Sequence, residues 1–182
     1  MKRAPGVVSS AWVSMDQSES FEDGLTALLP RLRRFAHTLS RNPADADDLT
    51  QATIERGLRS QAQWEPGTRL DSWLYRIMRN LWIDTVRSRG RKEDLHAPVE
   101  QAEQIGEDPR PAIEASIDLQ KAIAAMERLP DEQREVVGLI LIEGFGYREC
   151  SEILRLPIGT VSSRLVRGRT ALLQMMGTPH GD

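Results

Sequence analysis

The residues from Gly159 to Arg169 are of the types that contact DNA. Small residues at a helix start let backbone N–H groups approach phosphates, while serine and arginine side chains reach base edges in the major groove. Arginine recurs in this segment, and no acidic residue lies between Arg155 and Gly181. A helical hairpin with solvent-exposed arginines is the alternative. The candidate DNA-contacting residues here are Thr160, Ser162, Ser163, Arg164, Val166, Arg167 and Arg169.

A second basic segment runs from Trp64 to Lys92, with seven basic residues against three acidic ones. Within it, apolar residues from Leu70 to Leu81 recur at helical spacing and predict an amphipathic helix. The candidate nucleic-acid contacts on its polar side are Arg76, Asn80, Arg87 and Arg91. The three tryptophans of this segment are interpreted differently. Trp73 lies on the apolar stripe and is assigned to the core, and Trp64 is assigned to the packed anchor of a loop. Trp82 is either packed or a platform on which an unpaired base stacks.

An acidic helix precedes this segment and has the opposite charge. Asn42 and Pro43 are typical of a helix start, and the helix places Leu49, Ile54 and Leu58 on its inner side. The acidic side is either a solvated surface or a docking surface for a basic partner. Its candidate docking residues are Asp45, Asp47, Asp48, Gln51 and Glu55.

Two short helices joined by a tight turn position the C-terminal arginines. The pattern predicts a first helix from Tyr147 to Leu154 and a second from Gly159 to about Met176. In the second helix, Val161 and Leu165 are expected to face inward. This arrangement is typical of a helix-turn-helix.

The whole chain of 182 residues reads as all-α. Only nine residues are aromatic, helix formers dominate, and no segment alternates as a strand does. We expect two small helical domains, residues 21–93 and 115–176, joined by a flexible acidic linker, residues 94–114, that carries three prolines. Residues 1–20 predict a disordered lead-in, within which Met15 is an alternative start.

Several classes of function are excluded by composition. Cys150 is the single cysteine, so neither an internal disulfide nor a cysteine-based zinc site is expected; we interpret it as a small buried hydrophobe, with a redox-sensing thiol as the alternative. The three histidines are scattered, and no glycine-rich phosphate loop follows a strand. No apolar run approaches the about 20 residues of a membrane span, and no signal peptide is visible. We therefore expect a cytoplasmic protein that is not an enzyme and has no metal, no cofactor and no membrane insertion.

Several motifs together resemble the bacterial extracytoplasmic-function (ECF) sigma factors of the sigma-70 family. Asp45-Ala-Asp-Asp-Leu-Thr-Gln-Ala-Thr and Trp73-Leu-Tyr-Arg-Ile-Met-Arg-Asn80, followed by Arg87 to Lys92, resemble the second conserved region of that family. Three further segments resemble the fourth conserved region: Leu129-Pro-Asp-Glu-Gln-Arg-Glu-Val136, Glu143-Gly-Phe-Gly-Tyr147 and Pro157-Ile-Gly-Thr-Val-Ser-Ser-Arg164. The resemblance covers about residues 21 to 175 in the family's order.

The resemblance implies a promoter-specificity subunit of bacterial RNA polymerase without catalysis of its own. By analogy, the acidic helix docks on the clamp helices of the largest polymerase subunit, and the segment from Trp64 to Lys92 recognises and helps melt the minus-ten element. Ser162, Ser163, Val166 and Arg167 would contact the minus-thirty-five element, with Arg164 and Arg169 on phosphates. The expected partners are core RNA polymerase, promoter DNA and an anti-sigma factor that masks the polymerase-binding surfaces.

Three positions depart from the family pattern. Ser162 stands where members often carry a basic residue, and Cys150-Ser151 replaces a more usual aliphatic–alanine pair. Arg155 occupies a turn position where glycine is common, which strains the turn if a positive φ is required there. A sigma mimic that titrates an anti-sigma factor and a free-standing helix-turn-helix regulator are the alternative functions.

Overall fold

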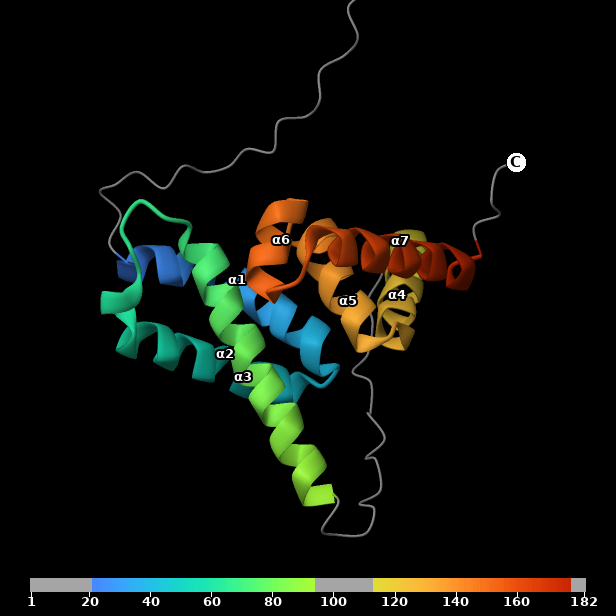
Figure 1. Ribbon diagram of the computed structural model, residues 1–182. Helices are drawn as coiled ribbons and strands as arrows, with labels where there is room; N and C mark the ends of the chain where they lie inside the picture. The colour runs from blue at the N-terminus through green and yellow to red at the C-terminus, as the bar shows by residue number, and fades with distance from the viewer. Residues whose placement is uncertain (1–20, 94–112, 178–182) are drawn as a thin grey trace, which may run out of the picture.

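The computed structural model describes residues 21–93 and 113–177, which form helices joined by short turns (Figure 1). The N-terminal domain consists of α1 (Phe21–Ser40), α2 (Pro43–Arg59), the 3-10 turn η1 (Gln61–Gln63) and α3 (Leu70–Glu93). The C-terminal domain consists of α4 (Ile113–Arg128), α5 (Asp131–Val137), the π-helical turn η2 (Gly138–Ile142), α6 (Tyr147–Leu154) and α7 (Ile158–Met175). Within the described ranges no strand occurs, and the all-α prediction is confirmed. The predicted lead-in and most of the predicted linker lie outside these ranges.

The start of α2 is as its sequence predicts. The side chain of Asn42 accepts a hydrogen bond from the backbone N–H of Asp45 at 3.2 Å, and Pro43 occupies the first helical position. Both residues satisfy or remove backbone donors that a helix start leaves without partners. Local chemistry therefore fixes where this helix begins.

The inner side of α2 differs from the prediction at Leu58, which is 45% exposed rather than buried. The buried positions of this helix include Thr53 and Gly57. Thr53 is tolerated there because its hydroxyl donates to the carbonyl of Leu49 at 2.7 Å. Gly57 lets α3 approach closely: a Cβ atom at that position would lie 3.0 Å from Cδ2 of Leu74. Because Gly57 faces α3, the next residue, Leu58, lies about 100° further around the helix and points to solvent.

One hydrophobic core runs through both domains. Phe35 of α1, Tyr75 of α3 and Phe145 after η2 contact one another in series, with successive ring centroids 5.0 Å apart, the first pair tilted and the second edge-to-face. Figure 1 shows α6 lying against α3, and α1 also contacts α5. The two predicted domains are therefore packed on each other in this structure.

The segment between α5 and α6 contains a wide turn. The backbone N–H of Glu143 donates to the carbonyl of Gly138, five residues earlier, at 2.9 Å. The extra residue in this turn leaves Leu141 at 53% exposure, whereas Leu139 and Glu143 point inward.

The turn of the helix-turn-helix requires a left-handed residue. Arg155 has a φ of 51° and ends α6, and the N–H of Leu156 donates to the carbonyl of Ser151 at 3.0 Å. The positive φ that the sequence analysis considered for this position is therefore present, in a conformation that glycine adopts more readily than arginine. None of the helices in residues 21–93 and 113–177 combines the length and the apolar character needed to cross a membrane.

Candidate nucleic-acid and protein-binding surfaces

The helix α7 presents the predicted arginine face to solvent. Val161 and Leu165 are buried, while Val166 is 61% exposed and Arg167 and Arg169 are exposed. A Cβ atom on Gly168 of the same helix would lie 2.7 Å from Cγ2 of Val137, so α7 packs tightly on α5. This packing fixes which side of α7 remains available to a ligand.

The remaining predicted residues of α7 are less exposed. Ser162 and Ser163 are half-buried, and the hydroxyl of Ser163 donates to the carbonyl of Thr160 at 3.0 Å. The Arg164 side chain is 20% exposed and pairs with Glu132 of α5 at 2.8 Å. Arg164 is therefore held against α5 by one of its nitrogens.

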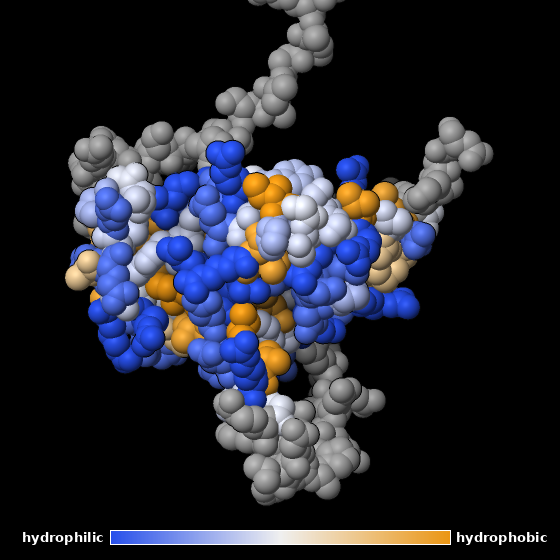
Figure 2. Space-filling model, viewed as in Figure 1, coloured by the Kyte–Doolittle hydropathy of each residue, from blue (hydrophilic) through white to orange (hydrophobic). Residues whose placement is uncertain are grey.

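The polar side of α3 contains the second predicted set of residues. Asn80 and Arg87 are exposed and Arg76 is half-buried, whereas the side chain of Arg91 lies outside the described residues. Figure 2 shows hydrophilic residues dominating this face of the molecule, with hydrophobic residues scattered between them.

The tryptophans of the N-terminal domain lie mainly in packing positions. The Phe21 ring lies 5.6 Å from that of Trp64 and 6.1 Å from that of Trp73, between centroids. Trp82 is half-buried and, with Arg87, lines a cavity of about 380 Å³ between α3 and the C-terminal domain.

Two carboxylates on the acidic side of α2, those of Asp45 and Asp47, form ion pairs with arginines of neighbouring helices. Both oxygens of Asp45 accept from the guanidinium of Arg89, at 2.6 and 2.7 Å, and these hydrogen bonds lower the pKa of Asp45. Asp47 pairs with Arg33 of α1 at 2.8 Å and is 54% exposed. The exposed row is completed by Asp48, Gln51 and Glu55.

A large groove, which the sequence does not predict, adjoins this acidic row. Its volume is about 1470 Å³, and it is lined by α1, α2, α4, η2 and the end of α7. Exposed apolar side chains line it, and Asp47, Gln51 and Glu55 contribute to its wall. The apolar lining includes Leu29, Leu119, Ile123, Leu141 and Ile142. The only sequence signal for it is the presence of apolar residues outside the buried stripes.

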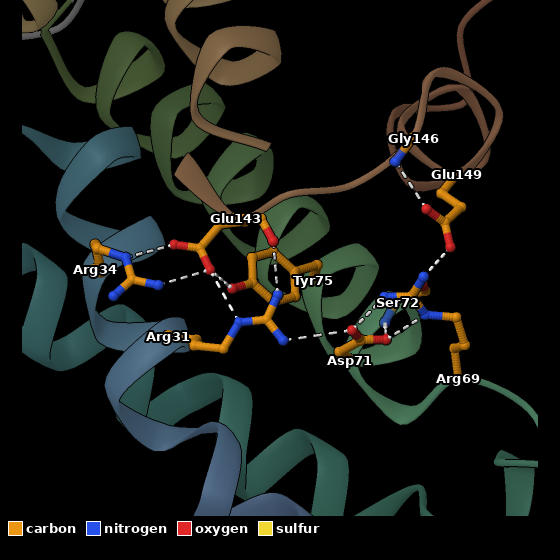
Figure 3. A network of polar contacts seen from close by, with 9 residues as sticks. All are labelled: Arg31, Arg34, Arg69, Asp71, Ser72, Tyr75, Glu143, Gly146 and Glu149. Carbon is orange, nitrogen blue, oxygen red and sulfur yellow. Dashed lines mark hydrogen bonds and ion pairs between the residues drawn. The ribbon is translucent and has the colours of Figure 1, made fainter. Parts of the chain in front are cut away.

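A buried polar network joins the two domains (Figure 3). Glu143 has a side chain only 1% exposed and accepts hydrogen bonds from Arg34 at 2.7 Å, Arg31 at 3.1 Å and the Tyr75 hydroxyl at 2.6 Å. Arg31 also donates to the backbone carbonyl of Glu143 at 2.9 Å. Burial, together with the neighbouring carboxylate, raises the pKa of Tyr75 and keeps its hydroxyl a donor.

Further ion pairs lie beside this network. Arg69 pairs with Asp71 at 2.6 Å and with Glu149 of α6, and Arg79 of α3 pairs with Glu135 of α5 at 2.6 Å. Burial raises the pKa of Glu135 although Arg79 opposes this effect. No sequence motif predicts the pairs Arg69–Glu149 and Arg79–Glu135, because each of these two joins residues more than 50 positions apart.

Other candidate chemistry is not supported by geometry. Cys150 is fully buried, as predicted, and burial raises the pKa of its thiol to about 12, which leaves little reactive thiolate at neutral pH. In the part of the chain that the structure describes, no three histidine, cysteine or carboxylate side chains are grouped to hold a metal ion.

Comparison with known proteins places both domains in one family. Residues 25–92 match the model of sigma-70 region 2, and residues 119–172 match that of sigma-70 region 4. The ECF RNA polymerase sigma factor EcfG of Rhodopseudomonas palustris is 35% identical over 162 residues, which cover 89% of this chain and 88% of the relative. SigE of Mycolicibacterium smegmatis, also an ECF sigma factor, is 42% identical over 78% of this chain and 56% of its own length.

A solved structure agrees with this assignment. The sigma factor RpoE, crystallised in complex with the anti-sigma factor NepR from Bartonella quintana, superposes with a TM-score of 0.76 at 32% identity, covering 88% of this chain and 98% of that one. The chain therefore belongs to the ECF sigma factors of RNA polymerase, which take part in transcription initiation and are not enzymes.

Proposed function

We propose that this protein binds core RNA polymerase and directs it to one class of promoters. The observation that carries the proposal is the presence of two exposed arginine-bearing helices, α3 and α7, one in each sigma-70 region. Each region alone offers a small contact with DNA. Because polymerase would hold both on one promoter, their weak affinities would combine as bivalent binding.

The C-terminal domain reads the minus-thirty-five element in this proposal. Val166 and Arg167 are the most exposed candidates for base contacts in the major groove, with Thr160, Ser162 and Ser163 nearer the helix start. Arg169 contacts phosphate. Arg164 also contacts phosphate, through the nitrogens that its pair with Glu132 leaves available.

The N-terminal domain recognises and helps melt the minus-ten element. Asn80, Arg76, Arg87 and Arg91 are assigned to this contact, together with the loop before α3. Capture of an extruded base in a protein pocket offsets a few kcal/mol of unstacking. The exposed Asn80 is suited to base contact, and the arginines to phosphates.

The acidic row on α2 is assigned to polymerase. Asp47, Asp48, Gln51 and Glu55 are exposed along one side of the helix, and Asp45, held by Arg89, lies at the edge of the row. A basic partner surface would gain both steering and specificity from this charge.

We further propose that an anti-sigma factor inhibits this cytoplasmic protein by occupying the apolar groove. The groove adjoins the acidic row, so an occupant would cover Asp47, Gln51 and Glu55. The Bartonella sigma factor crystallised with an anti-sigma factor supports the partner class.

Transcription with purified components tests the main proposal. Core polymerase is incubated with fragmented host DNA, with and without this protein, and the new 5′ ends are sequenced. New starts that share two spaced sequence elements are expected and would supply the promoter motif. No new starts despite polymerase binding would favour a sigma mimic, and the absence of both would overturn the proposal. A gel shift with duplex DNA alone identifies a free-standing regulator, because only that class binds DNA well without polymerase.

A further inference from the structure

We propose that Ser162 and Val166 of α7 together read one A·T base pair of the minus-thirty-five element, with the valine packed on the C5-methyl group of the thymine. The inference rests on the proposed function, because it names the base pair that this helix selects once it lies in the major groove. It extends that function by assigning a sequence preference to the uncharged part of the arginine face.

Val166 lies in the middle of the face assigned to DNA, and its side chain is 61% exposed. The packing of α7 uses other positions, namely Val161, Leu165 and Gly168, which are buried. Single exposed aliphatic residues are common on protein surfaces. This one differs in its position, since a helix that enters the major groove brings its exposed face against base edges. The group that covers the valine there must be apolar for its burial to be favourable.

The DNA-facing residues of α7 form two adjacent rows. Ser162 and Val166 are four positions apart, as are Ser163 and Arg167, and residues at this spacing lie one above the other on a helix. The row of Ser163 and Arg167 carries a charge and can contact guanine as arginine does. The row of Ser162 and Val166 has no charge, so it must recognise a base pair by other groups.

The hydroxyl groups of the two serines differ in their partners. The Ser163 hydroxyl donates to the carbonyl of Thr160 at 3.0 Å and accepts from Arg167 at 3.4 Å. Among the described residues, the Ser162 hydroxyl has no hydrogen-bond partner, and its residue is half-buried. Ser162 is therefore the serine whose hydroxyl remains available for a base.

An A·T pair offers what the uncharged row can bind. In the major groove it presents the thymine methyl group, the acceptors O4 of thymine and N7 of adenine, and the N6 donor of adenine. Val166 matches the methyl group, and the Ser162 hydroxyl can donate to either acceptor or accept from N6. A G·C pair has no methyl group and would place polar edges against the valine, where they lose water without gaining a partner. The row therefore selects A·T over G·C.

The neighbouring base pair is assigned to Arg167. This residue lies about 100° around α7 from Val166, so the two side chains meet adjacent base pairs. In the free protein Arg167 donates to the carbonyl of Ser163 at 3.3 Å and to its hydroxyl at 3.4 Å, which are long contacts. Guanine offers the two acceptors O6 and N7 in better geometry. We expect a minus-thirty-five element in which the A·T pair lies beside a G·C pair.

Replacing thymine by uracil tests the methyl contact, because it removes the C5-methyl group and keeps the base pairing. Polymerase is reconstituted with the full-length protein, and the promoters are those identified from the sequenced 5′ ends. Each thymine of the minus-thirty-five element, on either strand, is replaced singly, and each template competes with the unsubstituted one for transcription. At one position uracil should lower transcription about four-fold, the effect of one buried methyl group.

Protein variants assign this effect to its residues. In Val166→Ala the difference between thymine and uracil at the sensitive position should fall below about two-fold. Ser162→Arg places a guanidinium in the uncharged row and should shift the preference there towards G·C by about ten-fold. Leu173→Ala is the matched control: it shortens an aliphatic side chain, 37% exposed, two helical turns later on the same side of α7. This control should keep the full methyl effect.

The outcomes separate this inference from the proposed function. A minus-thirty-five element without an A·T pair would overturn the inference, as would a methyl effect that is absent at every thymine, survives in Val166→Ala or is also removed by Leu173→Ala. An unchanged base preference in Ser162→Arg would overturn the role of Ser162. In all these cases transcription still starts at shared elements, so the proposed function stands. If no form of the protein supports transcription from any template, the proposed function fails and this inference fails with it.

Discussion

The Tyr75 hydroxyl lies 2.6 Å from Oε2 of Glu143, although the two residues are 68 positions apart and belong to different sigma-70 regions. Both side chains are buried, so each supplies the partner that the other would lose on leaving water. This single hydrogen bond joins the hydrophobic core to the network between the domains.

Removing this hydroxyl should destabilise the protein. Tyr75→Phe keeps the ring against Phe35 and Phe145 but leaves a buried carboxylate one donor short, and we expect the free energy of unfolding to fall by about 1–3 kcal/mol. Urea denaturation followed by circular dichroism measures the change. Tyr147→Phe, at an exposed position on α6, is the matched control and should change stability little. Equal losses in the two variants would contradict the prediction.

Adding one methyl group between α7 and α5 should destabilise the protein. Gly168→Ala places a carbon 2.7 Å from Val137, and overpacking of this kind costs about 1–3 kcal/mol. Gly159→Ala lies in the same helix but meets no atom within 4 Å, so there the better helix propensity of alanine should leave stability equal or higher. Thermal melts of both variants provide the comparison, and a stabilised Gly168→Ala would show that the helices separate easily.

Arg167 and Arg169 should differ in what they contribute to DNA binding. Arg167→Ala is expected to weaken recognition of one promoter class by about 1–3 kcal/mol while leaving polymerase association intact. Arg169→Ala should weaken binding uniformly across sequences and reduce the salt dependence by about one phosphate contact. Competition between promoter variants bound by the reconstituted polymerase, at several salt concentrations, distinguishes the two patterns. Identical behaviour of the two variants would remove the distinction between base and phosphate contacts.

The acidic row on α2 should be needed for polymerase association. Reversing Asp48 and Glu55 together, as Asp48→Lys and Glu55→Lys, is expected to abolish both association with core polymerase and transcription, because a basic partner surface would then be repelled. Co-purification with core polymerase measures association. Glu152→Lys on α6 makes a charge reversal of the same kind outside the row and should retain binding. Survival of association in the double variant would show that the docking surface lies elsewhere.

The ion pair between Asp45 and Arg89 should give a defined pH dependence. Hydrogen bonds from Arg89 lower the pKa of Asp45 below its ordinary value of 3.8, so the unfolded chain binds more protons than the native one between the two values. The stabilisation is complete above about pH 5 and is lost as the pH falls through 3.8 towards the native pKa. The stability difference between the unchanged protein and Asp45→Asn should therefore be largest near neutrality and shrink in acid. Denaturation series at several pH values test this, and a constant difference would contradict it.

Local sequence predicts the features that are decided by neighbouring residues. The start of α2 follows from Asn42 and Pro43, and the left-handed conformation of Arg155 follows from the short turn of the helix-turn-helix. In each case the deciding groups lie within about five positions of one another. Such contacts need no knowledge of how the domains pack.

Features decided by distant contacts were not predictable in this way. Leu58 fits an apolar stripe, yet the close approach of Leu74 to Gly57 turns it outward. Glu143 follows four residues of a hydrophobic run and reads as the end of a helix. Its donors on α1 and α3 become apparent only once the domains are packed together.

The wide turn at η2 also makes this segment sensitive to chain length. Its extra residue rotates everything that follows by about 100°, the angle of one position along a helix, and so aims Glu143 at the arginines of α1. Regular winding with the same number of residues would turn the carboxylate away from them by about 100°. A one-residue deletion that removes the wide turn would instead leave the glutamate four positions after Gly138, in nearly its present direction, and should be tolerated better than a one-residue insertion.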